Sequence, residues 1–202
     1  MSMVRALRTL TALENGTMSG SQLETQLSGS TARRGEFVLL CASEGAAKRM
    51  AASAVTMTAV TASTTAMAEF VKHTAARMAA WGSDNALTAI KASATAMAAM
   101  RGAGGYEVKA FSGAANTPIS IDLVGRAYIL LGVSANHPAV YAITAVSRRG
   151  SSGMTSTIVT SAIISSAAQD SNQATPLNGP VVMSQNGGPS YTYYLGLLRC
   201  DA

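Results

Sequence analysis

The residues 52–60 (ASAVTMTAV), 62–70 (ASTTAMAEF) and 92–100 (ASATAMAAM) are variants of one ten-residue pattern, which decides the fold of the N-terminal half of the chain. In each block a Ser follows an Ala, and an apolar residue stands four and again seven positions after the Ser. An internal period of this kind predicts a repeat architecture. The repeated serines are Ser43, Ser53, Ser63, Ser83 and Ser93.

A period of ten does not suit one straight α-helix, because three turns would need about 3.3 residues each instead of 3.6. The pattern predicts a string of short helices, each opened by a Ser or Thr whose hydroxyl caps the free backbone N–H groups. The block after Phe70 fits once it is shifted by one place, with Thr74 as the cap and Met78 and Trp81 as the apolar positions.

Helices this short need tertiary packing for their stability, and three arrangements are open. We favour parallel association of identical chains, which buries the apolar row along a common axis. Stacking along one chain would give a solenoid-like rod, and an Ala-rich helix or helical hairpin would make the period incidental. The predicted oligomer interface is Met50, Met57, Val60, Met67, Phe70, Met78, Trp81, Leu87, Ile90, Met97 and Met100.

The chain divides into four regions by composition and pattern. Residues 1–40 form a helical attachment region, residues 41–100 the repeat stem, residues 101–105 a Gly-rich hinge and residues 106–202 a β domain. Three helices are expected in the first region. They run over 4–13, from a capping box of Ser21 and Glu24 to Leu27, and from Ala32 into the repeat.

Beyond the Gly-rich segment the apolar period changes from helical spacing to two, which predicts β-strands. The expected strands are 106–111, 119–124, 127–133, 139–147, 154–164, 181–184 and 191–198, with turns between them that include Asn178-Gly179-Pro180. Short strands separated by such turns predict an antiparallel β-sandwich. The expected fold class is therefore segregated α+β.

Charge and chemistry exclude several classes of function. The net charge of +5 is spread over both halves without a basic block, so no nucleic-acid partner is expected. Cys41 and Cys200 lie far apart and predict free thiols, while His73 and His137 have no positioned partner in the sequence. We expect no catalytic, cofactor or metal site, no enzyme activity and no membrane span.

A ligand surface is a separate hypothesis for the β domain. Tyr191, Tyr193 and Tyr194 form an aromatic cluster, and His137 and Asn186 lie in turns. Aromatic side chains on an exposed strand can form a platform for a ligand, although they also pack against cross-strand neighbours.

The repeats resemble the Ala-Ser-x-Thr-Ala-Met-x-Ala-Val repeats of predicted tail-fibre and other virion proteins of tailed bacteriophages. Residues 52–60, 62–67 and 92–100 carry this resemblance, and residues 13–19 and 22–24 are similar to the segment that often precedes those repeats. The similarity covers about half of the chain, roughly residues 10 to 100. The chain departs from the tidier repeats at 73–81 and 84–85.

The resemblance implies a virion structural protein, a homotrimer whose N-terminal region attaches to other virion proteins. Two functions follow from it. The first is a short fibre or appendage of the tail, collar or head, whose β domain binds a host-surface glycan or protein. The second is an adaptor, such as a baseplate, neck or decoration protein, whose β domain binds another phage protein. A phage depolymerase is a distant third, because it would need paired carboxylates in a groove.

Overall fold

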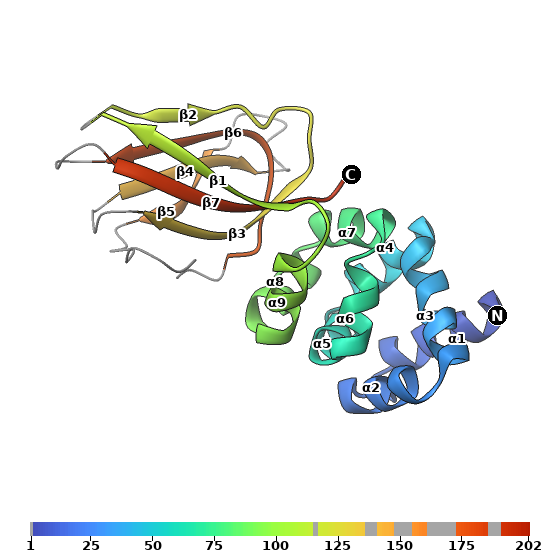
Figure 1. Ribbon diagram of the computed structural model, residues 1–202. Helices are drawn as coiled ribbons and strands as arrows, with labels where there is room; N and C mark the ends of the chain where they lie inside the picture. Colours follow the sequence, from blue (N-terminus) through green and yellow to red (C-terminus); the bar gives the residue numbers. More distant parts are fainter. Residues whose placement is uncertain (1, 115–116, 136–140, 148–154, 161–172, 186–190) are drawn as a thin grey trace. The chain divides into compact units, whose positions relative to one another are not determined.

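The computed structural model confirms a segregated α+β fold, with helices followed by an antiparallel sheet (Figure 1). It describes residues 2–114, 117–135, 141–147, 155–160, 173–185 and 191–202. The chain forms two compact units, Met1–Gly104 and Gly105–Asp201, so the boundary falls inside the Gly-rich segment. The helices that precede the repeat belong to the same unit as the repeat helices.

The helical unit consists of short helices in close succession. Their bounds are α1 Met3–Glu14, α2 Gly20–Gly29, α3 Thr31–Ala42, α4 Glu44–Ala52, α5 Ala54–Ala62, α6 Thr64–Phe70, α7 Thr74–Trp81, α8 Asp84–Ala92 and α9 Ala94–Arg101. From α3 to α6, one extended Ser is the only residue between successive helices. That Ser ends one helix and begins the next, so the chain changes direction every ten residues.

The predicted Ser caps are confirmed. Each of the five repeated serines accepts a hydrogen bond from the backbone N–H three residues further on, as in Ser53 Oγ to the Thr56 nitrogen at 3.1 Å and Ser63 Oγ to the Ala66 nitrogen at 3.0 Å. This bond satisfies one of the backbone donors that a helix start leaves free. The repeated Ser therefore permits both the break and the restart of the helix.

The one-place shift that we predicted for the fourth block is wrong. His73 occupies the N-cap position of α7, so the caps continue at intervals of ten through residues 63, 73 and 83. His73 makes no side-chain cap bond, yet its backbone has the same extended conformation as the capping serines. Arg77 and Ala80 thus take the inward positions, and both are buried. The register of this repeat could not be recognised in the sequence because the polar Arg77 stands where the other repeats have an apolar residue.

The helices stack along one chain as a solenoid with three helices per turn. Helix α4 packs on α7, α5 on α8 and α6 on α9, which are all pairs three helices apart. Two hydrogen bonds also join helices that are three apart. Ser83 Oγ donates to the Ala51 carbonyl at 2.6 Å, and Ser93 Oγ donates to the Thr61 carbonyl at 2.7 Å. Each of these serines caps its own helix and also ties it to the turn before.

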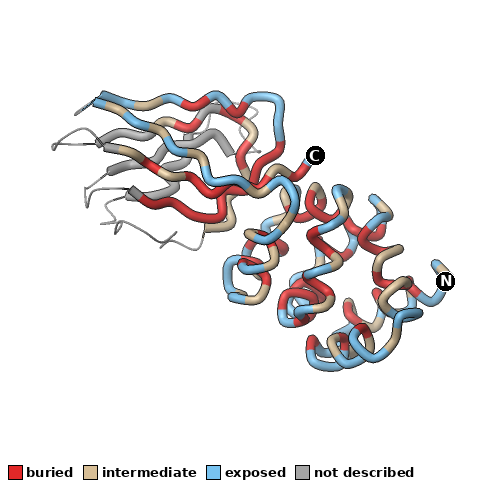
Figure 2. Tube along the Cα trace, viewed as in Figure 1, coloured by how far each residue is buried: buried red, intermediate tan, exposed pale blue. Residues whose placement is uncertain are grey.

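The interior of the solenoid is made from the apolar positions of the repeat (Figure 2). The side chains four and seven residues after each cap are buried, as predicted for the five Ser caps, and so are the residues three after it, from Ala46 to Ala96. Ala at this third position lets neighbouring helices approach closely. Thr56 replaces it in α5, and its buried Oγ1 has no hydrogen-bond partner among the described residues.

The N-terminal helices begin where the sequence predicts, with one correction. The capping box of α2 is Ser19 with Gln22, two residues before the predicted pair of Ser21 and Glu24. Ser19 accepts from the Gln22 backbone, and Gln22 Oε1 accepts from the Ser19 nitrogen at 2.8 Å. Glu24 instead accepts hydrogen bonds from Ser63 and Thr65 of the repeat.

The described residues of the β unit form one antiparallel sheet of seven strands. They are β1 Tyr106–Gly113, β2 Ile119–Ile121, β3 Tyr128–Ala135, β4 Tyr141–Ser147, β5 Thr155–Thr160, β6 Thr175–Gln185 and β7 Tyr191–Arg199. Their order is β1-β7-β3-β6-β4-β5, and β2 pairs with β6. Within the described residues the strands form one continuous hydrogen-bonded sheet, and the antiparallel β-structure expected for this part of the chain is confirmed.

Strand β6 joins the two parts of this sheet. Its first residues, 175–177, pair with β3, while residues 181–183 pair with both β2 and β4. The predicted turn at Asn178-Gly179-Pro180 lies within β6, at the point where the strand changes partners. Residues of β2, β3, β6 and β7 contribute to one buried cluster, in which Leu130, Leu195 and Leu197 have no exposed surface.

Candidate binding site

The predicted oligomer interface is the interior of a single chain. Nine of its eleven side chains, all except Met78 and Trp81, are buried within the described residues of one copy. Met78 and Trp81 are half-buried because α7 keeps the unshifted register. The prediction that this apolar row meets a second chain does not agree with this burial. The stacking alternative accounts for the same residues.

Of the predicted ligand residues, the structure describes the side chains of Tyr193 and Tyr194, and these two do not form a common exposed surface. Tyr193 belongs to the core of the β unit and is 1% exposed, so its place in a surface platform is wrong. Tyr194 is half-buried, because successive side chains of a strand point to opposite faces. His137 and Asn186 lie outside the described residues, as does the side chain of Tyr191.

The cysteines and His73 offer no reactive pair among the described residues. Cys41 and Cys200 are both buried, and neither forms a disulfide. Burial raises the pKa of the Cys41 thiol far above its ordinary range, with the Glu69 carboxylate adding to the shift, so the thiol stays protonated and is a poor nucleophile. His73 serves as the N-cap residue of α7. The described residues include no group of three or more His, Cys, Asp or Glu side chains that could hold a metal ion.

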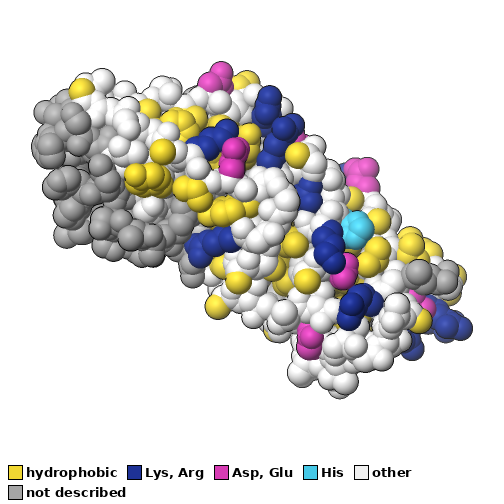
Figure 3. Space-filling view, in the orientation of Figure 1, with side chains coloured by type: hydrophobic (Ala, Val, Ile, Leu, Met, Phe, Trp, Pro, Cys, Tyr) yellow, Lys and Arg dark blue, Asp and Glu magenta, His cyan; other side chains and the backbone are white. Residues whose placement is uncertain are grey.

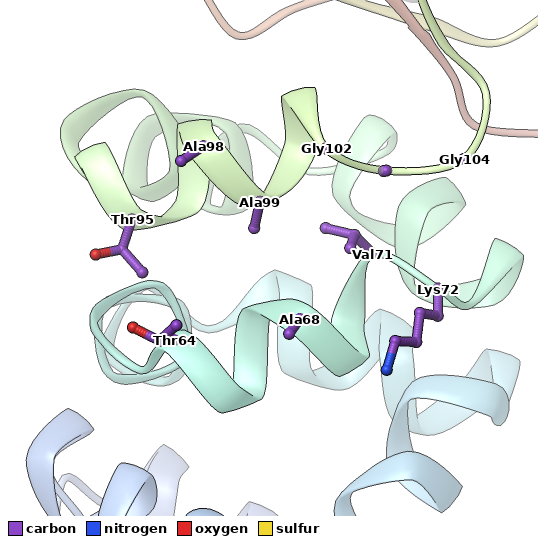
Figure 4. A pocket seen from close by; sticks show the side chains of 10 residues that line it. Thr64, Ala68, Val71, Lys72, Thr95, Ala98, Ala99, Gly102 and Gly104 are labelled. Atoms are coloured by element: carbon purple, nitrogen blue, oxygen red, sulfur yellow. The ribbon is translucent and has the colours of Figure 1, made fainter.

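A groove lies between α6 and α9 within the helical unit (Figure 4). Its volume is about 570 Å³, in the range of small-molecule or side-chain pockets. Thr64 and Thr95 stand at one end, and Lys72 lies at the other. Small side chains such as Ala68 and Ala99 form the walls between them, which explains why two stacked helices leave space here.

The chemistry of this groove is suited to binding. The lining offers methyl groups, two hydroxyls and one ammonium group, and the Lys72 Nζ already donates to both carboxylate oxygens of Glu69 at 3.1 Å. No carboxylate or thiol is among the lining residues, so the groove holds no nucleophile with a base beside it. The groove was not predicted from the sequence. Comparing repeats that lie three apart, as stacked helices do, would have placed the small residues Ala68 and Ala98 opposite each other.

Glu24 connects the N-terminal helices to the repeat. Its Oε2 accepts from Ser63 Oγ at 2.6 Å and from the Thr65 nitrogen at 2.8 Å, and its Oε1 accepts from Thr65 Oγ1 at 2.7 Å. The hydrogen bond from Ser63, followed by those from Thr65, lowers the pKa of Glu24 below its ordinary value. A carboxylate at the N-terminus of α6 is also favoured by the helix dipole.

Comparison with known proteins assigns no family. No protein-family model matches the chain, and no curated protein matches it. In the part of the chain that the structure describes, no helix has the length and apolar character needed to cross a membrane.

Proposed function

We propose that this chain is a structural adaptor in the virion of a tailed bacteriophage, with the helical unit bound to one virion component and the β unit to another. The proposal joins two supports. The ten-residue repeat resembles those of phage virion proteins, and the fold supplies two compact units on one chain.

One observation favours the adaptor over a trimeric fibre. A stem made from parallel copies needs an apolar row that faces the other chains, but Met57, Met67 and Met97 are at most 2% exposed within one copy. Because the apolar side chains of the solenoid are buried within one chain, its partners can contact only its outer surface. Other repeat proteins bind their partners through such surfaces. The same burial removes the physical reason for a homotrimer through the repeat.

The available chemistry is consistent with a binding role. The groove between α6 and α9 has apolar walls, and its cation is paired with Glu69. Adaptors bind through shape and surface chemistry and require no acid–base pair. Virion location and a partner in the particle follow from the resemblance and belong to the proposal.

The test is a nonsense mutation in the gene of a phage that encodes this chain, combined with immunogold labelling of purified wild-type particles. We expect label on the particle, and mutant particles that lack the component normally attached beyond the adaptor. Complete particles that fail only to adsorb to the host would favour the short-fibre alternative. Absence of the chain from purified wild-type particles would contradict any virion role.

A further inference from the structure

An arginine-lined hollow lies among the N-terminal helices, remote in sequence from the groove of Figure 4. It has a volume of about 330 Å³. Arg5 and Arg8 of α1 and Arg33 of α3 line it, together with Thr9, Met18 and Gln26. No carboxylate is among its lining residues, so this hollow is cationic.

The acidic side chains of residues 1–42 already have partners other than Arg5 and Arg8. Glu14 pairs with Arg49, whose Nε lies 3.0 Å from Glu14 Oε1, and Glu24 accepts the hydrogen bonds of the α6 N-terminus. Glu36 pairs with Arg33, with 3.2 Å between Arg33 Nη1 and Glu36 Oε2. These are the three acidic residues of that segment.

Arg5 and Arg8 therefore have no countercharge within the segment. No hydrogen bond or ion pair links either guanidinium to another described residue, and both side chains are exposed. Two like charges three residues apart on a helix repel each other, typically by a few tenths of a kcal/mol. An anionic partner would relieve this repulsion, and guanidinium groups bind carboxylates through paired hydrogen bonds.

The size and isolation of the hollow favour a protein partner over a nucleic acid. A volume of about 330 Å³ accommodates one or two carboxylate side chains. A nucleic-acid site needs a longer basic track, whereas four cations of the helical unit, Arg33, Lys48, Arg49 and Lys72, each pair with a carboxylate. On the face shown in Figure 3, Asp and Glu side chains lie beside several of the Lys and Arg side chains.

We infer that this hollow is the docking site for an acidic peptide segment of the protein that the helical unit binds, an inference that rests on the proposed adaptor function. Two neighbouring carboxylates of the segment pair with Arg5 and Arg8. Gln26 supplies an amide for the peptide backbone, and Met18 contributes an apolar wall. Contacts of this type add specificity and a salt-dependent association rate.

The test measures binding of the full chain to a fluorescent synthetic peptide in which pairs of glutamates alternate with leucine, and to the same peptide with glutamines. We expect the acidic peptide to bind at least about tenfold more tightly. The double variant Arg5→Gln plus Arg8→Gln should lose about tenfold or more of that affinity. Lys48→Gln, which changes an exposed cation of α4 that pairs with Glu44, is the matched control and should retain it.

Three results would overturn the inference: equal affinity for both peptides, unchanged affinity of the double variant, or a single-stranded DNA oligonucleotide that binds as tightly as the acidic peptide. Circular dichroism of each variant shows that the fold is kept, as expected for exposed side chains. The outcome is separable from the virion test. If the particles are labelled but the chain does not bind the acidic peptide, the proposed adaptor function is kept and the docking site is rejected. If the chain binds the peptide but is absent from virions, the adaptor function is rejected and the peptide site is kept.

Discussion

The helical unit and the β unit differ in how far apart in the sequence their stabilising contacts lie. A Ser-capped repeat helix depends on a hydrogen bond between residues three apart and on a neighbouring helix about thirty residues away, as in Ser93 with Ala96 and with Thr61. In the β unit, β1 pairs with β7, so Tyr106 lies opposite Leu198. Local, periodic contacts leave a visible pattern in a sequence, whereas long-range strand pairing does not.

The two units also carry separate spectroscopic probes, which makes the comparison testable. The single Trp of the chain, Trp81, lies in α7, and all six tyrosines lie beyond residue 105. The buried cluster of the β unit contains no residue of the helical unit. A change in one core should therefore be detected mainly by the probes of that unit.

The largest effect is expected for Met67→Asp in α6. Met67 is fully buried, and an unpaired carboxylate there costs several kcal/mol, on the order of the whole stability of a small unit. We expect loss of the helical circular dichroism signal and a change in Trp81 fluorescence, while the tyrosine signal is retained. Val55→Asp in α5 is the control, since Val55 is 53% exposed. A folded helical Met67→Asp variant would contradict the assigned interior.

Leu195→Ala in β7 is the reciprocal change. Leu195 has no exposed surface and belongs to the buried cluster, so its truncation should destabilise the β unit by about 2–5 kcal/mol. Chemical denaturation followed by tyrosine absorbance should show an earlier transition, with the Trp81 transition unchanged. Equal shifts of both transitions would mean that the two units unfold as one.

Gly20→Ala tests the closeness of the contact between α2 and α5. A Cβ at Gly20 would lie 2.8 Å from the Ala59 carbonyl oxygen, a backbone atom that cannot move aside cheaply. We expect a loss of about 1–3 kcal/mol in the free energy of unfolding, measured by urea denaturation. Gly29→Ala changes the last residue of the same helix, where a Cβ meets nothing within 4 Å, and should cost nothing. Equal effects of the two substitutions would refute the close approach.

Glu24→Gln should weaken the tie between α2 and α6 by about 1–3 kcal/mol at neutral pH, because charge-assisted hydrogen bonds are lost. The pKa of Glu24 is lowered by folding, so its contribution is present above the ordinary value of 4.5 and is lost as the pH falls through the folded-state pKa. The difference between wild type and variant should therefore shrink in acid. Glu44→Gln, an exposed carboxylate paired with Lys48, is the control. A difference that stays constant with pH would exclude the ionised contact.

The smallest effect is expected for Thr56→Val, and it is stabilising. The Oγ1 of Thr56 is buried without a hydrogen-bond partner among the described residues, so replacing it with a methyl group removes a desolvation cost. We expect a gain of about 0.5–1 kcal/mol, measured as a higher melting temperature. Thr58→Val in the same helix is the control, since the Thr58 hydroxyl is exposed and bonds the Ala54 carbonyl. A loss of stability for Thr56→Val would indicate an unseen partner.

Features that depend on local contacts could be predicted from the sequence, whereas features that depend on long-range contacts could not. The Ser caps and the residues four and seven after them could be assigned because each depends on its own helix. The register of α7 was missed because Arg77 replaces an apolar residue. The choice between a common axis and a solenoid was also missed, since either arrangement buries the same face. The second half of β6 was predicted as a strand at 181–184, but its first half was missed because Pro176 and Pro180 signal turns.

The candidate sites were harder to predict than the fold. The groove between α6 and α9 is lined by small residues that carry no chemical signature of their own. The arginine hollow combines α1 and α3, and Arg5 and Arg33 become neighbours of one cavity only after folding. Tyr193 was misplaced because aromatic residues in strands serve cores as well as surfaces.

The central claim is that one chain fills the interior of its own repeat, and the dependence of helix unfolding on protein concentration tests it most directly. Thermal unfolding of the full chain is followed by far-ultraviolet circular dichroism and Trp81 fluorescence over about a hundredfold range of concentration. A self-contained solenoid predicts the same helical content and the same midpoint throughout. Helical content that fades on dilution, with a midpoint that rises with concentration, would show that the repeat is completed by other copies and would contradict the account.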